Sequence, residues 1–113
     1  MALARFDLNR SLLTIAAVGN IEIRVLGLEM SPHVVMRRGV LGMHSTEPSL
    51  SERSWNEKAL LIMHSDGVQS RWHWKDYTAI SRQPPAVIAR HLLQVLGKPE
   101  DDATILVARS AAL

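Results

Sequence analysis

The sequence predicts an α+β domain built on an antiparallel β-sheet of about five or six strands, with one helix packed on a face of that sheet. Short apolar segments with the two-residue period of strands recur along the chain, and turn-forming residues separate several of them. One stretch near the C-terminus has the spacing of an amphipathic helix. Because 113 residues leave room for one core only, we expect residues 1–113 to form a single domain.

Three strands are expected in the first quarter of the chain. Residues 2–8 alternate between two faces, whereas residues 12–18 are apolar on both. Residues 21–25 alternate again. Turn residues at 9–11 and a Gly-Asn pair at 19–20 separate these segments, and both residues of the pair tolerate the positive φ of a two-residue turn. We therefore expect two hairpins, with the three strands paired antiparallel to one another.

The rest of the chain predicts further strands and the helix. Strands are expected at residues 33–37, 58–64 and 103–108, and residues 39–57 are mostly loop with a short strand near 50–55. Two prolines open the helix, which extends from near Pro85 to Leu96 and stops at a glycine. In the strand at residues 21–25, the polar side chains should lie opposite the apolar face. These polar residues are Glu22 and Arg24.

Composition excludes several classes of protein and site. Hydrophobic residues make up 47% of the chain and charged residues 21%, which is typical of a folded globular domain. The absence of cysteine excludes disulfides, thiolate metal sites and thiol nucleophiles. No segment approaches the roughly 18 consecutive apolar residues of a membrane span, so we expect a cytoplasmic protein. The net charge of +2 gives nucleic-acid binding little support.

Aspartates at two junctions between a strand and a turn are candidate ligands. Asp66 follows an apolar run, and Asp101 and Asp102 precede the last predicted strand. A strand end fixes the backbone while the adjoining turn leaves carboxylate oxygens accessible, and hard cations such as Mg²⁺ and Mn²⁺ prefer oxygen ligands. Asp-Gly is also an ordinary turn sequence, and an Asp pair is also typical of a solvated loop. Spacing alone leaves both interpretations open.

The residues around these aspartates resemble a known family. Residues 59–68 read Ala-Leu-Leu-Ile-Met-His-Ser-Asp-Gly-Val, a proline-opened helix follows, and residues 101–108 read Asp-Asp-Ala-Thr-Ile-Leu-Val-Ala. This order resembles the C-terminal half of the PPM-type metal-dependent serine/threonine phosphatases, and most closely their SpoIIE-like branch, which includes the small stressosome phosphatase. Residues 12–23 resemble an upstream hairpin of that branch, and residues 39–42 resemble its glycine-rich connection. The resemblance covers nearly the whole chain.

The resemblance implies a β-sandwich flanked by helices, with a two-metal centre at one edge. In the family the Asp of the Ser-Asp-Gly motif and the first acid of the Asp-Asp/Asn-x-Thr motif ligate a metal, which would make Asp66 and Asp101 ligands of Mn²⁺ or Mg²⁺. The ions activate water directly, so no protein nucleophile and no other catalytic residue is implied. The remaining motif residues would support these ligands. They are Ser65, Gly67, Asp102 and Thr104.

The chain also departs from the family pattern. An upstream Asp-Gly-x-Gly-His-Gly type motif supplies the bridging metal ligand in the family, whereas the only aspartate before Asp66 here is Asp7. Residues 56–58, Asn-Glu-Lys, replace the usual Gly-Asp turn. We therefore expect this chain to be a partial domain that is inactive alone. One sheet face should stay uncovered, so we expect a homodimer or capture of the missing N-terminal half.

Other residues carry weaker signals. Arg71, Trp72 and Trp74 mix basic and aromatic side chains, as protein-docking and nucleic-acid-stacking surfaces do, but two tryptophans that simply cover the sheet would look the same. The five histidines show no ligand spacing and no catalytic order.

Three functions follow from these observations. The first is a phosphatase half that acts on a phosphorylated bacterial regulatory protein, such as an anti-sigma antagonist or a stressosome component. The second is a non-catalytic interaction module of the same fold. The third, which we favour least, is a small basic nucleic-acid-binding module.

Overall fold

The computed structural model describes residues 1–17, 19–26, 33–36 and 49–110. Residues 39–42, and the rest of the predicted loop up to residue 48, lie outside this range. The strands are β1 (Ala2–Asp7), β2 (Leu12–Ala17), β3 (Ile21–Leu26), β4 (His33–Met36), β5 (Ser49–Ser54), β6 (Leu60–Ser65) and β7 (Ile105–Arg109), and the helices are the 3-10 helix η1 (Trp74–Ile80) and α1 (Pro85–Leu96).

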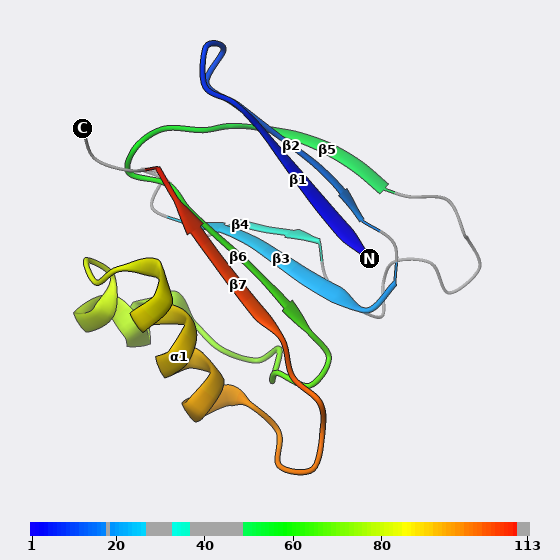
Figure 1. Ribbon diagram of the computed structural model, residues 1–113, viewed down its shortest axis with the longest axis vertical. Coiled ribbons are helices and arrows are strands. Elements are labelled where there is room, and N and C mark those ends of the chain that lie inside the picture. Colours follow the sequence, from blue (N-terminus) through cyan, green and yellow to red (C-terminus); the bar gives the residue numbers. More distant parts are fainter. Residues whose placement is uncertain (18, 27–32, 37–48, 111–113) are drawn as a thin grey trace.

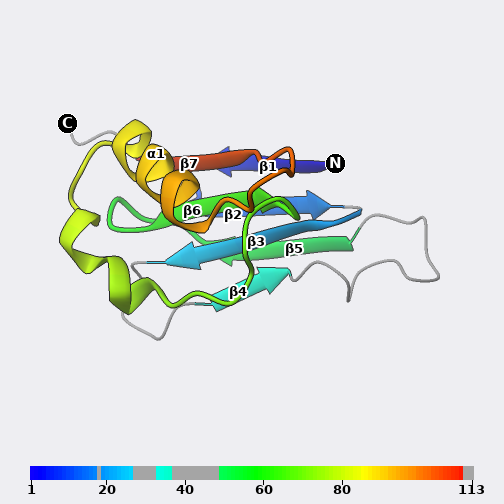
Figure 2. The same ribbon diagram turned by 90° about the horizontal axis from the view of Figure 1, so that it is seen from below.

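The strands form two antiparallel sheets that face each other. The first sheet has the order β1-β2-β5 and the second the order β4-β3-β6-β7. Helix α1 lies on the outer face of the second sheet, so the layers are sheet, sheet and helix (Figures 1 and 2). The predicted α+β class, with antiparallel strands and a helix on one sheet face, is confirmed. The seven described strands are divided between two sheets rather than joined in one.

The predicted hairpin at residues 19–20 is wrong. β2 pairs with β1 and β5, whereas β3 pairs with β4 and β6, so β2 and β3 are not hydrogen-bonded neighbours. The turn at Gly19, whose φ is +97°, instead carries the chain from one sheet to the other. The physical reason is that β2 and β3 each have an apolar face. Crossing between sheets lets these two faces pack against each other.

The space between the sheets holds the first hydrophobic core. Inward-facing residues of β2, β3 and β6 alternate with outward-facing ones and are almost fully buried. This core contains Leu13, Ile15, Ala17, Ile23, Val25, Trp55, Ala59 and Leu61. We expected the inner face of one sheet to be uncovered, and this expectation is wrong because β1, β2 and β5 cover it. The first sheet thus covers the face through which we expected a homodimer or a captured half to bind.

A second core lies between the second sheet and α1. Ile88, Leu92 and Leu96 recur at four-residue spacing and form the buried stripe of α1. They pack with Leu26, Leu60, Ile62, Val68 and Trp72. The helix begins at Pro85 and ends before Gly97, as predicted. No helix among the described residues is long and apolar enough to cross a membrane.

Candidate functional site

The two aspartate motifs lie at the same end of the second sheet. β6 ends at Ser65 where its neighbour β7 begins, because the strands run antiparallel with His64 opposite Ile105. The backbone N–H of Ser65 donates to the carbonyl of Thr104 at 3.0 Å. In return, the backbone N–H of Thr104 donates to the Ser65 hydroxyl at 3.0 Å. These two bonds join the Ser-Asp-Gly turn to the strand that follows the second motif.

Gly67 brings the two backbones into direct contact. A Cβ at this position would lie 2.0 Å from the carbonyl oxygen of Asp102 and 2.9 Å from the Cα of Ala103. No side chain fits there, so the motif needs glycine for close approach rather than for a positive φ. The carbonyl of Gly67 also accepts a 2.8 Å bond from the backbone N–H of Lys98. The loop before β7 is therefore held against the turn after β6.

The carboxylates of the two motifs are exposed at this end of the sheet. Asp66 lies in the turn, and Asp101 and Asp102 lie in the loop that contacts it. Carboxylate oxygens suit Mg²⁺ and Mn²⁺, so the donor chemistry fits a hard cation. Among the described residues, however, no three His, Asp or Glu side chains are grouped closely enough to hold a metal ion. The role of these aspartates as metal ligands therefore stays a prediction.

A buried ionic network lies on the outer face of β3 and β6, next to this end. Glu22, Arg24 and His64 have exposed fractions of only 2%, 7% and 1%. The guanidinium of Arg24 donates to Oε2 of Glu22, with Nε at 3.0 Å and Nη2 at 2.9 Å. Nε2 of His64 lies 2.9 Å from the same carboxylate oxygen. Our expectation that Glu22 and Arg24 lie on the face opposite the apolar residues is correct, but that face is covered.

Arg24 connects the sheet to the segment that follows the Ser-Asp-Gly turn. Its Nη1 donates to the carbonyl of Trp72 at 2.6 Å, and its Nη2 donates to the carbonyl of Ser70 at 2.7 Å. The guanidinium also lies over the Trp72 ring, 3.8 Å from its centroid. One buried cation thus pairs with a carboxylate, two carbonyls and an aromatic face. This arrangement fixes the course of the chain immediately after the predicted metal-ligand turn.

Burial and the neighbouring side chains together set the pKa of Glu22 in this network. Burial by itself raises the pKa of Glu22, but the hydrogen bond with His64 and the charges of Arg24 and His64 outweigh burial and hold that pKa below its ordinary value of 4.5. Nδ1 of His64 lies 3.1 Å from the Ser65 carbonyl, and Nε1 of Trp72 lies 3.2 Å from Nε2 of His64. Nε2 cannot donate to Glu22 and accept from Trp72 at once, so the tautomer of the His64 ring decides which of these two contacts is a hydrogen bond.

The three residues of the predicted partner surface differ in their exposure to solvent. Arg71 is exposed and Trp74 is half-buried, whereas Trp72 is only 5% exposed and packs in the second core. Trp72 therefore covers the sheet, and a stacking stripe made of Trp72 and Trp74 is not present at the surface. No motif in the sequence assigns a functional role to Glu22 or Arg24. The signal that could have found them is a charged pair within an otherwise apolar strand.

This chain is similar to known proteins in its structure and not in its sequence. No protein-family model matches the sequence, and no curated protein is significantly similar to it. Solved structures do match. A chain from a structure described as the bacterial stressosome, a modular system adapted to control secondary messenger signalling, is 25% identical with a TM-score of 0.72. The match covers 96% of this chain and 57% of that one.

Two structures of the phosphatase domain of the cell fate determinant SpoIIE from Bacillus subtilis also match, each at 20% identity over 96% of this chain. Their TM-scores are 0.70, for the crystals presoaked with Mn, and 0.67. The chain has the fold of the SpoIIE phosphatase domain. It corresponds to the C-terminal half, as the motif resemblance implied, and spans 55% and 57% of the two SpoIIE chains. The PPM-type resemblance is therefore confirmed for the fold.

Proposed function

We propose that this chain is the C-terminal half of a metal-dependent protein serine/threonine phosphatase domain. The observation that carries the proposal is the junction of the two motifs, where Ser65 and Thr104 exchange hydrogen bonds and Gly67 contacts Asp102. The similarity to the SpoIIE phosphatase domain supports this assignment. The proposed substrate is a phosphorylated bacterial regulatory protein, such as an anti-sigma antagonist or a stressosome component, in the cytoplasm.

In this proposal Asp66 and Asp101 hold Mn²⁺ or Mg²⁺, and Asp102 lies beside them. When bound, the ions would supply an activated water and neutralise the phosphoryl oxygens. Ser65 and Thr104 hold the turn against β7, and Gly67 allows the two loops to approach. Further ligands are needed, because the described residues hold no group of three. We propose that an upstream half-domain supplies these ligands. In the family, the Asp-Gly-x-Gly-His-Gly type motif of that half has this role.

A phosphate-release assay tests the proposal. Phosphoserine peptide is incubated with Mn²⁺ and either this chain or a chain extended upstream by the missing half-domain. We expect release from the extended chain only, and its loss in Asp66→Asn and Asp101→Asn. Asp76→Asn, which changes an exposed carboxylate on η1, is the matched control and should keep full activity. Equal release by all these variants would show that the two aspartates have no part in the reaction.

One observation favours a second function, a non-catalytic interaction module of the same fold. The described residues hold no complete metal site, although the fold and the motif junction are intact. This alternative predicts that the extended chain neither binds Mn²⁺ nor releases phosphate. Mn²⁺ binding by the extended chain, measured by calorimetry, distinguishes the two functions.

A further inference from the structure

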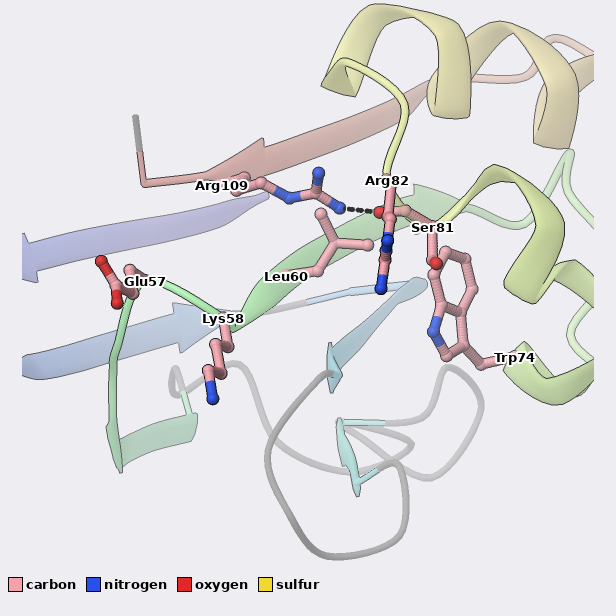
Figure 3. Close-up of a pocket in the computed structure, with 7 residues that line it drawn as sticks. All are labelled: Glu57, Lys58, Leu60, Trp74, Ser81, Arg82 and Arg109. Atoms are coloured by element: carbon pink, nitrogen blue, oxygen red, sulfur yellow. Dashed lines mark hydrogen bonds between the residues drawn. The ribbon is translucent and has the colours of Figure 1, made fainter. Parts of the chain in front are cut away.

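A basic pocket lies at the opposite end of β6 from the aspartate motifs. It has a volume of about 500 Å³, within the range of roughly 300–1,000 Å³ that is usual for small-ligand sites. β6 separates it from the Ser65 turn by roughly 17 Å, at ~3.4 Å per residue. The lining residues come from the segment before β6, from β6 and β7, and from η1 and the turn that follows it (Figure 3). They are Glu57, Lys58, Leu60, Trp74, Ser81, Arg82 and Arg109.

The charge of this pocket is strongly positive. Among the described residues that line it, Lys58, Arg82 and Arg109 stand against the single carboxylate of Glu57. Lys58 and Arg82 are exposed, and neither forms an ion pair with a carboxylate among the described residues. Three such cations repel one another, and an anion bound between them would relieve that repulsion.

Arg109 is held in place before any ligand arrives. Its guanidinium donates to the carbonyl of Ser81 and, at 3.2 Å, to the carbonyl of Gln83. These two bonds attach the turn before α1 to the end of β7. A guanidinium has five N–H donors, so donors remain for a ligand. Because the cation is already positioned, ligand binding costs little side-chain entropy at this residue.

The apolar walls of the pocket strengthen the attraction between its cations and a bound anion. Leu60 is buried at the start of β6, and the indole of Trp74 is half-buried at the start of η1. Apolar walls keep water from part of the cavity and lower the local dielectric constant, which makes charge-assisted hydrogen bonds stronger. Arginine forks and a lysine ammonium are the groups that bind phosphoryl oxygens best.

We propose that this pocket binds a phosphate monoester dianion or free phosphate. A carboxylate ligand would neutralise one of the excess positive charges, whereas a phosphate monoester carries roughly −1.5 to −2 at neutral pH and matches the excess of the cations over Glu57. The ligand would be contacted by Lys58 and Arg82, with Arg109 behind them and Trp74 at the side. This site is separate from the aspartate end and does not depend on the proposed phosphatase function.

The test is an NMR titration of the whole chain in the presence of a metal chelator. Inorganic phosphate and a phosphoserine peptide are the two probes, and the unphosphorylated peptide is the blank. We expect saturable shifts of the Trp74 indole N–H and of the Ser81 and Arg82 amides in the millimolar range or below. A response to the peptide identifies a phosphorylated protein group as the ligand, and a response to phosphate alone identifies free phosphate.

Variants make the test specific. Lys58→Gln and Arg82→Gln should each weaken binding about tenfold, because each removes a charged hydrogen-bond donor worth about 1.4 kcal/mol. Arg5→Gln, which removes an exposed arginine from β1 in the other sheet, should leave binding unchanged. Both pocket variants change exposed side chains, so we expect them to fold normally. Unchanged NMR signals from the residues of the two hydrophobic cores would confirm this. Absence of saturation with both probes, or equal weakening by Arg5→Gln, would overturn the proposal while leaving the proposed phosphatase function untouched.

Discussion

Ser65 and Thr104 are joined by two hydrogen bonds, one between their backbones and one from the Thr104 N–H to the Ser65 hydroxyl, each 3.0 Å long. Serine in the Ser-Asp-Gly motif is therefore an acceptor that holds β7 against β6. Ser65→Ala leaves the Thr104 N–H without this partner and should lower the free energy of unfolding by about 1 kcal/mol. Thr104→Ala keeps both bonds, because Thr104 takes part through its backbone, and should be nearly neutral. Urea denaturation of the two variants measures the difference, and equal losses would contradict this role of Ser65.

Gly67 should be intolerant of even one methyl group. The Cβ of Gly67→Ala would meet the backbone carbonyl oxygen of Asp102 at 2.0 Å. The Gly67–Lys98 and Ser65–Thr104 hydrogen bonds hold the two segments in place. We expect a loss of about 1–3 kcal/mol of stability, as for overpacked sites. Gln69→Ala is the control two residues away, since the Gln69 side chain is exposed and its backbone bond to the Leu96 carbonyl remains. A Gly67→Ala protein as stable as wild type would show that the loops separate easily.

Arg24 should be the charged residue whose loss destabilises the fold most. Arg24→Met removes the cation but leaves the Glu22 carboxylate buried, and breaking a buried pair in this way costs about 3–5 kcal/mol. The double variant Glu22→Gln with Arg24→Met should recover part of that loss, because no unpaired charge remains. Chemical denaturation of both single variants and the double variant gives the coupling energy. Additive single losses would mean that the two side chains act independently.

The stabilising effect of Glu22 should depend on pH in one direction. Its folded-state pKa is lowered, so ionised Glu22 stabilises the folded protein above the ordinary pKa of 4.5, and this contribution is lost as pH falls through the folded-state pKa. The glutamine side chain in the Glu22→Gln variant has no ionisable group and does not titrate. The stability difference between wild type and Glu22→Gln should therefore shrink on acidification below about pH 4.5. Urea midpoints measured from neutral to acid pH test this, and a constant difference would contradict it.

Local signals in the sequence predicted the elements well. Period-two segments, the paired prolines and Gly97 located the strands and placed α1 at Pro85–Leu96. Motif order also predicted that the Ser65 turn and the Asp101 loop lie at the same edge of the sheet, and the structure brings their backbones together through Gly67 and Thr104. Their role as one metal site stays a prediction. The positions of the strands, the helix and the two turns were predictable because each depends on residues close in sequence or on a motif whose order the fold preserves.

Long-range relationships were not predictable in this way. The Gly19 turn is compatible both with a hairpin and with a crossing between sheets, and only the packing of β2 against β3 distinguishes them. Glu22 and Arg24 fit a solvated strand face until Trp72, far along the chain, covers them. The cations of the basic pocket come from three separate segments. No local pattern in the sequence brings such residues together.

Mn²⁺ titration of this chain followed by NMR shows whether the two aspartate motifs form one cation-binding edge. Paramagnetic Mn²⁺ broadens the signals of nearby nuclei. We expect the amides of Asp66, Gly67 and residues 101–103 to broaden first and together, with weaker Mn²⁺ binding in Asp66→Asn and in Asp101→Asn but not in Asp76→Asn. Broadening that begins elsewhere, or that persists unchanged in both aspartate variants, would show that the two motifs do not form a cation-binding edge.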